Sequence, residues 1–289
     1  MLANILVTTL VNAAAYAMLA VGFSLIFGVG RIINLAHTAY YMLAGFSIYT
    51  LVATAGCPAA PAVLLTIALI TVIAVLCYKL LIDPMREHET TVLIITIALA
   101  LVFQELMLKY FGGQFRSVPS LARGFFVILG VQVTRQHALT CMVLVLILGA
   151  VWLLLQKTRL GLAIRATAQD KEVANLMGMD VSRIAAITAA ISAALAATAG
   201  ALVAPLNILE PHMWLHPLTI ILAIVVLGGL GSIKGSILGA VIIALSESLV
   251  IFLLPQGSFL KGAFSLLIMI IVLLIRPEGL FGVALEGER

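Results

Sequence analysis

The chain has 289 residues, of which 63% are hydrophobic and 10% charged, and its formal net charge is +4. Soluble globular proteins carry about 45–50% apolar and roughly 25% charged residues, so lipid must be the solvent for much of this surface and a soluble domain is excluded. The basic residues are scattered and are not interleaved with aromatic residues in a patch, which excludes a nucleic-acid partner.

Apolar segments of helical length follow one another along the whole chain. They predict an all-α polytopic membrane protein that forms a single domain over residues 1–289, with eight or nine transmembrane helices. The nine expected spans are 3–29, 35–55, 60–81, 91–111, 137–155, 184–204, 217–231, 236–254 and 262–275. The seventh is short, because a hydrocarbon core of about 30 Å takes about 20 residues, so it is expected to be broken or partly re-entrant.

The placement of Lys and Arg predicts the orientation of these spans. With the loop 156–183 in the cytoplasm, eleven of the sixteen basic residues lie inside and five outside. The N-terminus is then outside and the C-terminus inside. The loop 112–136, which this assignment places outside, contains three Arg and no acidic residue.

Sequence motifs for enzymatic chemistry are missing. There is no GxxxxGK[ST] motif for ATP and no GxSxG nucleophile elbow, and the HExxH-like stretch His88–Val92 has Val at its fifth position. The cysteines Cys57, Cys77 and Cys141 have no metal-ligand spacing and are interpreted as small apolar residues in helices. We therefore expect a chain that binds neither metal nor cofactor and is not an enzyme.

Two carboxylates fall within expected spans. Glu105 follows Gln104 in the fourth span, and Glu247 lies between Ser246 and Ser248 in the eighth. A carboxylate in hydrocarbon is costly, so both are expected to face protein. They are candidates for a translocation path, and the alternative is a structural, hydrogen-bonded role between helices.

Small residues at four-residue spacing predict close contacts between helices. One row is Ser192, Ala196 and Gly200, and the other is Gly231, Gly235 and Gly239. Plain helix packing and a seam near a moving gate both fit these rows. The Gly-rich turns at 28–45 and 228–239 are faintly similar, but one such match does not establish an internal repeat.

The longest predicted cytoplasmic segment is Lys157–Arg183. Its part Ala163–Met177 is rich in helix-forming residues and free of Gly and Pro, so it predicts a helix that Gly178 ends as a C′ glycine. Leu176 and Met177 are then apolar and exposed at the tip. This helix is expected either to insert into a groove of a partner protein or to lie on its own bundle.

The segment resembles the coupling loop of the branched-chain amino acid permease family of ATP-binding-cassette importers. The family pattern G-x-A-x-R-A-x-x-x-D-x-x-x-A-x-x-M-G is met by Gly161, Ala163, Arg165, Ala166, Asp170, Ala174, Met177 and Gly178. The same family is similar to this chain in three further stretches, namely Gly22–Gly28 with Arg31–His37, Val226–Ser232 with Gly235–Ala240, and Arg276–Gly282.

The stretch Asn34–His37 and the chain length resemble the shorter of the two paired permeases of such systems. A Gly commonly follows the His in the family, and here Thr38 stands in its place. Asn34 is expected to cap the start of a helix by accepting a hydrogen bond from a free backbone N–H. A role of Asn34 and His37 at the substrate gate is the alternative.

The resemblance implies one half of a transmembrane importer in a bacterial or archaeal inner membrane. It implies as partners a paralogous permease, two cytoplasmic ATPase subunits that hold ATP and Mg, and an extracytoplasmic binding protein. The implied substrates are leucine, isoleucine, valine or similar apolar amino acids. Urea, short amides or other amino acids are alternatives within the family, and a stand-alone channel or secondary transporter, which needs no coupling loop, is the alternative outside it.

Overall fold

The computed structural model describes residues 2–122, 124–128, 131–254 and 256–281. Most of them are helical. The helices are α1 (Leu2–Gly30), α2 (His37–Tyr49), α3 (Ala59–Cys77), α4 (Glu89–Phe111), α5 (Arg135–Lys157), α6 (Arg159–Gln169), α7 (Lys171–Leu176), α8 (Val181–Val203), α9 (Leu215–Gly228), α10 (Ile233–Leu253) and α11 (Gly257–Ile275). Short π or 3-10 turns extend three of them: η1 (Thr50–Thr54) follows α2, η2 (Tyr78–Ile82) and η3 (Asp83–Met85) follow α3, and η4 (Ala204–Leu206) follows α8.

Each of the nine expected spans coincides with a helix in the described part of the chain. Seven helices are long and apolar enough to cross a membrane, and the prediction of a helical multi-pass protein is confirmed. The short seventh span is α9, with 14 residues. At about 1.5 Å per residue it is about 21 Å long, less than the hydrocarbon core.

In the described part of the chain, the loop between α4 and α5 contains a two-stranded sheet that the all-α prediction lacks. Strand β1 (Phe125–Ile128) pairs antiparallel with β2 (Val131–Thr134), with Phe125 opposite Thr134. The aromatic and β-branched residues of both strands favour extended backbone. The Arg135 guanidinium lies 5.2 Å from the centre of the Phe126 ring, which adds a cation–π contact at the base of this hairpin.

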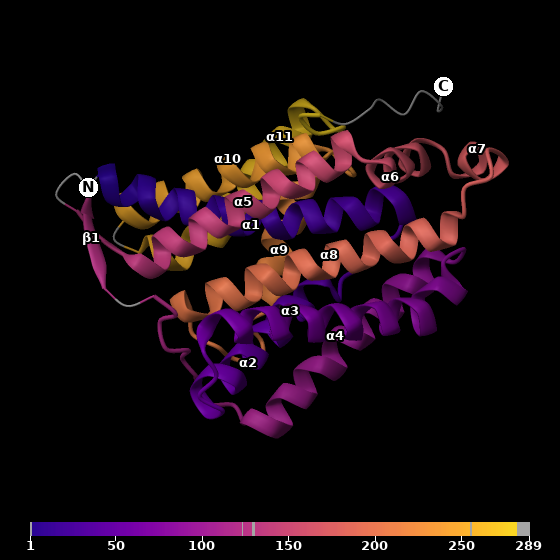
Figure 1. Ribbon diagram of the computed structural model, residues 1–289. Coiled ribbons are helices and arrows are strands. Elements are labelled where there is room, and N and C mark those ends of the chain that lie inside the picture. Colours follow the sequence, from indigo (N-terminus) through magenta and orange to yellow (C-terminus); the bar gives the residue numbers. More distant parts are fainter. Residues whose placement is uncertain (1, 123, 129–130, 255, 282–289) are drawn as a thin grey trace.

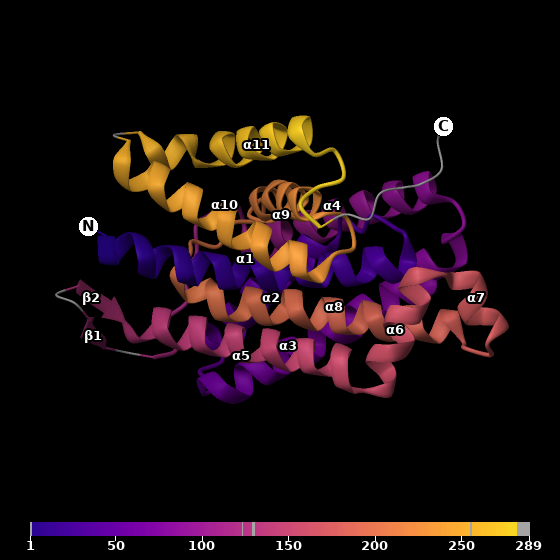
Figure 2. The same cartoon turned by 90° about the horizontal axis from the view of Figure 1, so that it is seen from above.

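The helices form two halves of opposite direction around a buried centre. In each half a long buried helix, α1 or α8, is followed by a short helix and two outer helices (Figures 1 and 2). The helices α1 and α8 contact each other, and α1 packs along α10 as α8 packs along α3. Helices α1–α4 and α8–α11 thus form an inverted repeat, a common architecture of transporters. The faint similarity of residues 28–45 to 228–239 does not follow this repeat, because it pairs the α1–α2 turn with the α9–α10 turn.

The hairpin and the α6–α7 segment lie at opposite ends of the molecule (Figure 1). We call these the hairpin end and the coupling end. The first helix begins at the hairpin end, and α11 runs from the side of the hairpin end toward the coupling end (Figure 2). This arrangement agrees with the expectation that the loops 112–136 and 156–183 lie on opposite sides of the membrane. The assignment of the coupling end to the cytoplasm stays a prediction.

Thiol labelling tests this orientation. Single cysteines at Gln169 and Gln114, both exposed, are introduced after Cys57, Cys77 and Cys141 have been replaced. An impermeant reagent added to intact cells should label the cysteine at 114, and the cysteine at 169 should react only after the membrane is opened. Labelling of both from one side would contradict the topology.

Glycines allow the closest helix contacts. A Cβ at Gly200 of α8 would overlap the carbonyl oxygen of Tyr41 in α2, and a Cβ at Gly239 would lie 2.8 Å from the carbonyl oxygen of Ile224 in α9. At Gly235 a Cβ would overlap the carbonyl oxygen of Gly228. Both rows of small residues therefore contain positions where two backbones meet.

Gly231 is a correction to the predicted row, because it lies in the turn between α9 and α10. Its φ of +80° is left-handed, as is that of Gly229 at +97°. A Cβ on Gly231 would lie 3.6 Å from the Cα of Gly28 at the end of α1. The consecutive glycines end α9 at Gly228, so Gly231 serves the turn and not a helix face.

Candidate functional site

The coupling segment, residues 158–180, is two helices and not the single helix 163–177 that its composition predicts. Asp170 separates them with an extended backbone, φ −150° and ψ 113°. Its Oδ1 accepts hydrogen bonds from the N–H groups of Glu172 at 2.9 Å and Val173 at 3.0 Å. This N-cap satisfies the free donors of α7, which gives the backbone a favourable alternative to a continuous helix.

The first half of the segment folds back on α5 through a tight turn. Thr158 Oγ1 accepts a hydrogen bond from the Gly161 N–H at 3.0 Å. A Cβ at Gly161 would overlap the carbonyl oxygens of Leu154 and Leu155, so only glycine fits there. Arg165 donates a 2.6 Å hydrogen bond to Gln156 Oε1. Asp170 and Arg165 therefore both have partners within the chain.

The second half ends in an exposed apolar tip. Ala174 is buried, whereas the exposed fractions of Leu176 and Met177 are 85% and 75%. Gly178, with φ +80°, follows the last turn of α7, and the Met179 N–H donates to the Ala174 carbonyl oxygen at 3.1 Å. The tip is therefore held in place by its own backbone and does not lie on the bundle.

Two side chains join the coupling segment to the end of α1. Lys171 Nζ donates a 2.6 Å hydrogen bond to the Gly30 carbonyl oxygen, and Arg31 Nη2 donates to the Ala168 carbonyl oxygen at 3.5 Å. Burial, and then the charges of Arg31 and Arg86, lower the pKa of the Lys171 ammonium. The sequence did not point to Lys171, because its partner is a backbone carbonyl 141 positions away.

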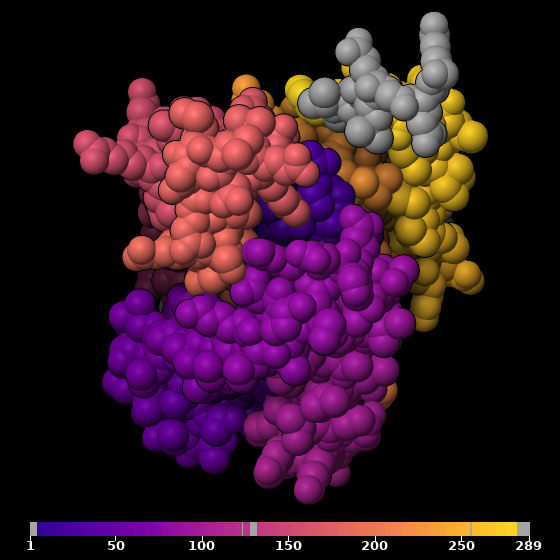
Figure 3. Space-filling model, turned by 90° about the vertical axis from the view of Figure 1, so that its right-hand side faces the viewer, coloured from indigo at the N-terminus to yellow at the C-terminus, as the bar shows by residue number. Residues whose placement is uncertain are grey.

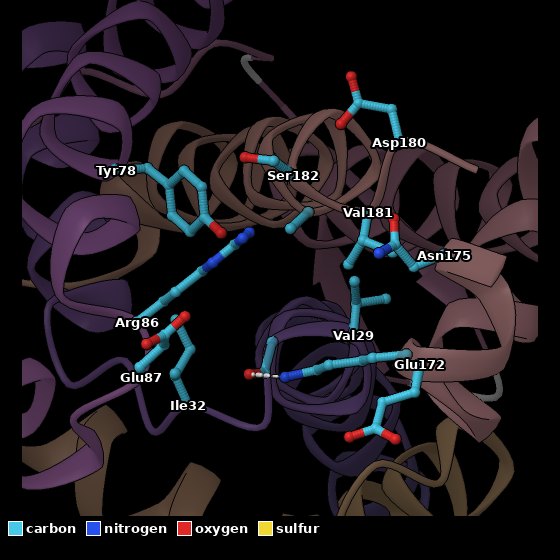
Figure 4. A pocket seen from close by; sticks show the side chains of 13 residues that line it. Val29, Ile32, Tyr78, Arg86, Glu87, Glu172, Asn175, Asp180, Val181 and Ser182 are labelled. Atoms are coloured by element: carbon cyan, nitrogen blue, oxygen red, sulfur yellow. Dashed lines mark hydrogen bonds between the residues drawn. The ribbon is translucent and has the colours of Figure 1, made fainter. Parts of the chain in front are cut away.

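A cavity of about 550 Å³ lies beside this junction. Its walls come from the end of α1, the η2–η3 turn, α7 and the start of α8. Arg86 extends into it from one wall, and Asn175 and Glu172 lie on the opposite wall (Figure 4). Viewed from the coupling end, α6–α7 and the region of η2–η3 flank an area where α1 is visible (Figure 3). Helix α7 therefore faces open space on the side of η3.

Asn34 and His37 lie where α1, α2 and α8 meet. The Asn34 Oδ1 accepts a 3.1 Å hydrogen bond from the Ala36 N–H in the turn before α2. The N-cap of α2 is Ala36, and no side chain caps this helix, so the prediction that Asn34 caps it is wrong. The His37 Nε2 lies 3.0 Å from the Leu19 carbonyl oxygen, and its Nδ1 lies 3.2 Å from the Ser192 Oγ. Because a carbonyl can only accept, Nε2 is the donor nitrogen. These contacts favour the structural alternative over a gate.

Glu247 faces protein, as the sequence predicts. Its side chain is buried between α1, α10 and α11. The Tyr16 hydroxyl donates to its Oε2 at 2.7 Å, and the Ser265 hydroxyl donates to its Oε1 at 3.0 Å. Both oxygens thus have partners, which favours a structural role here as well.

Glu105 does not face protein within this chain, and this corrects the expectation. Its side chain lies on the exposed face of α4. The neighbouring Gln104 takes the buried position and donates to Glu105 Oε1 at 3.4 Å. The helical period puts Gln104 toward the interior and Glu105 outward, since adjacent residues point in directions about 100° apart. The four candidates for a translocation path are therefore not brought together in one site.

The inverted repeat of long apolar helices is typical of a multi-pass membrane transport protein. A sequence model of the permease component of branched-chain amino acid transport systems matches residues 5–273, and the chain belongs to this family. It is thus a permease component, located as a multi-pass protein in the inner membrane.

Several permease proteins are similar to this chain over nearly its whole length. The high-affinity branched-chain amino acid transport system permease protein BraD of Pseudomonas aeruginosa is 28% identical, over 96% of this chain and 94% of its own. The corresponding protein LivH of Escherichia coli is 26% identical, over 93% and 92%. A probable branched-chain amino acid transport permease protein LivH of Methanocaldococcus jannaschii is 30% identical, over 92% and 88%.

A solved structure is similar in fold. It is PsaBC from Streptococcus pneumoniae in complex with Fab, with a TM-score of 0.53 at 16% identity, over 96% of this chain and 94% of the other. At this identity the similarity concerns the path of the helices alone.

Proposed function

We propose that this chain is the permease subunit of an ATP-driven importer of branched-chain or related apolar amino acids. The names of BraD and LivH support the substrate class. The chain carries no P-loop and is proposed to hold no cofactor of its own, so that ATP and Mg are bound by two partner ATPase subunits. A second permease and an extracytoplasmic binding protein complete the proposed assembly.

The exposed tip at Leu176 and Met177 is the observation that carries the proposal. Apolar side chains of this exposure, outside the spans and on a capped helix, are typical of an element that a partner protein covers. The hydrogen bonds of Lys171 and Arg31 to backbone carbonyls connect this element to α1. Docked ATPases would thereby move the coupling segment and shift the bundle between two states, provided that ATP binds one state better than the other.

Reconstitution tests the function. The chain is purified with the permease, ATPases and binding protein encoded in neighbouring reading frames, and uptake into proteoliposomes is measured for leucine, isoleucine, valine, short amides and urea. We expect uptake of the branched-chain amino acids that requires both ATP and the binding protein. Uptake by this chain alone without ATP would favour a secondary transporter, and uptake of urea or amides alone would assign another substrate.

A further inference from the structure

Glu105 lies on an uncovered helix face whose other exposed residues are apolar except Lys109. After Glu89 and Thr90 at its start, the exposed residues of α4 recur at helical spacing and form this face. They are Ile94, Ile97, Ala98, Leu101, Val102, Glu105, Leu106, Lys109 and Tyr110. A carboxylate on such a face costs roughly 2.5 kcal/mol or more if acyl chains surround it at mid-depth. Since Glu105 is six residues from the end of α4 at Phe111, about 9 Å along the axis, a polar environment must reach it there.

A buried hydrogen-bond chain holds this carboxylate in place. The Trp214 indole, itself buried, donates from Nε1 to Gln104 Oε1 at 2.9 Å. Because an indole N–H can only donate, the amide oxygen of Gln104 faces Trp214 and its NH₂ group faces Glu105. Gln104 Nε2 then donates to Glu105 Oε1 at 3.4 Å. Gln104 of α4 and Trp214 at the start of α9, both buried, thus orient the exposed carboxylate of Glu105.

The remaining acceptor capacity of Glu105 is not met by any cation among the described residues. Glu105 takes part in no ion pair within 4.0 Å there, and Lys109, one turn further along α4, does not reach it. The exposed side chains one turn toward the coupling end are the apolar Leu101 and Val102. A fixed carboxylate beside an apolar wall matches a ligand with an ammonium group next to an aliphatic side chain.

We propose that Glu105 binds the α-ammonium group of the amino acid during translocation, with the exposed face of α4 turned toward the path and not toward lipid. This inference rests on the proposed function. The Glu105 carboxylate then determines the class of substrate, because a zwitterionic amino acid pairs with it and neutral urea or an amide does not. Gln104 and Trp214 are positioning residues that hold the carboxylate.

Uptake by the complete transporter in proteoliposomes, with saturating binding protein, tests the role of the charge. Glu105→Gln should lower leucine uptake roughly tenfold or more, as expected for the loss of one charge-assisted hydrogen bond, and Glu105→Asp should retain part of the activity. The matched control is Met142→Gln, which places the same amide on an exposed position of α5, outside the proposed path and seven residues from the start of that helix at Arg135, and should leave uptake near the wild-type rate.

If the wild-type transporter takes up no amino acid, the proposed function is wrong. If the wild type is active and the Glu105→Gln variant is equally active, only the role of Glu105 is wrong. A second measurement keeps Glu105 in place. Leu101→Cys, one turn from Glu105 on the same exposed face and in a chain without other cysteines, should react with an impermeant thiol reagent, and leucine with its binding protein should slow this reaction. An unreactive cysteine, or one that substrate does not protect, would overturn the proposal.

Discussion

Gly235→Leu is expected to abolish the folded permease. The backbones of α9 and α10 cross at Gly228 and Gly235, where a Cβ on either residue would overlap backbone atoms of the other. Backbone cannot move aside as a flexible side chain can, so the helices would have to separate. Overpacking by a methylene in a well-packed core costs about 1–3 kcal/mol, and an isobutyl group against a carbonyl oxygen should exceed this. The measurement is the amount of monodisperse protein extracted from the membrane.

Gly149→Leu provides the matched control, because Gly149 is also helical, in α5, and has nothing within 4 Å of an added Cβ. It should extract like the wild type. Gly235→Ala should be intermediate between Gly235→Leu and the wild type. Normal extraction and normal uptake of Gly235→Leu would show that the α9–α10 crossing is looser than the structure describes.

Two backbone hydrogen bonds close to this crossing give a structural role to the last sequence motif, the stretch that follows α11. Leu280 and Phe281 donate from their backbone N–H groups to the carbonyl oxygens of Leu227 at 2.8 Å and Gly228 at 3.0 Å. These are the last carbonyls of α9, which have no partner within the helix. The described part of this motif, residues 276–281, therefore completes a helix end, and Gly279, with φ +78°, gives the turn that brings it there.

The positions of the helices follow from the sequence because they depend on local composition. A run of apolar residues has to be helical in lipid, where each backbone group needs a partner within its own segment. The tip at Leu176 and Met177 was predictable for a similar reason, since Gly178 favours the left-handed backbone that ends a helix. These features need no knowledge of which segments are neighbours.

The remaining features depend on tertiary contacts. Composition favours one continuous helix over 163–177. The N-cap geometry of Asp170 favours a break in that helix, and the placement of α7 in the fold decides between the two conformations. The contact of Lys171 with Gly30 and the inverted repeat have no signal in residue identity. For Glu105, the expectation treated every membrane carboxylate as inward-facing, and it failed because Gln104 occupies the inward position beside Trp214.

Met177→Asp is expected to separate the permease from its ATPase without unfolding it. Met177 is 75% exposed and Leu176 is 85% exposed, so neither side chain contributes to the interior of the chain. In the proposed complex both are covered by the ATPase, and an uncompensated carboxylate in such an apolar contact is costly. Loss of a central apolar anchor costs about 2 kcal/mol or more, so ATPase retention on purification and ATP-dependent uptake should both fall roughly tenfold or more.

Met85→Asp is the matched control for this variant, since Met85 is also exposed, at 45%, and lies in η3, outside the coupling segment. It should retain the ATPase and transport at the wild-type rate, and all variants should insert into the membrane in equal amounts. The double variant Met177→Asp with Leu176→Asp should lose what remains of the interaction. If the single and the double variant both keep the ATPase and full uptake, α7 is not the docking element, and a transporter without ATPase subunits becomes the better account of this chain.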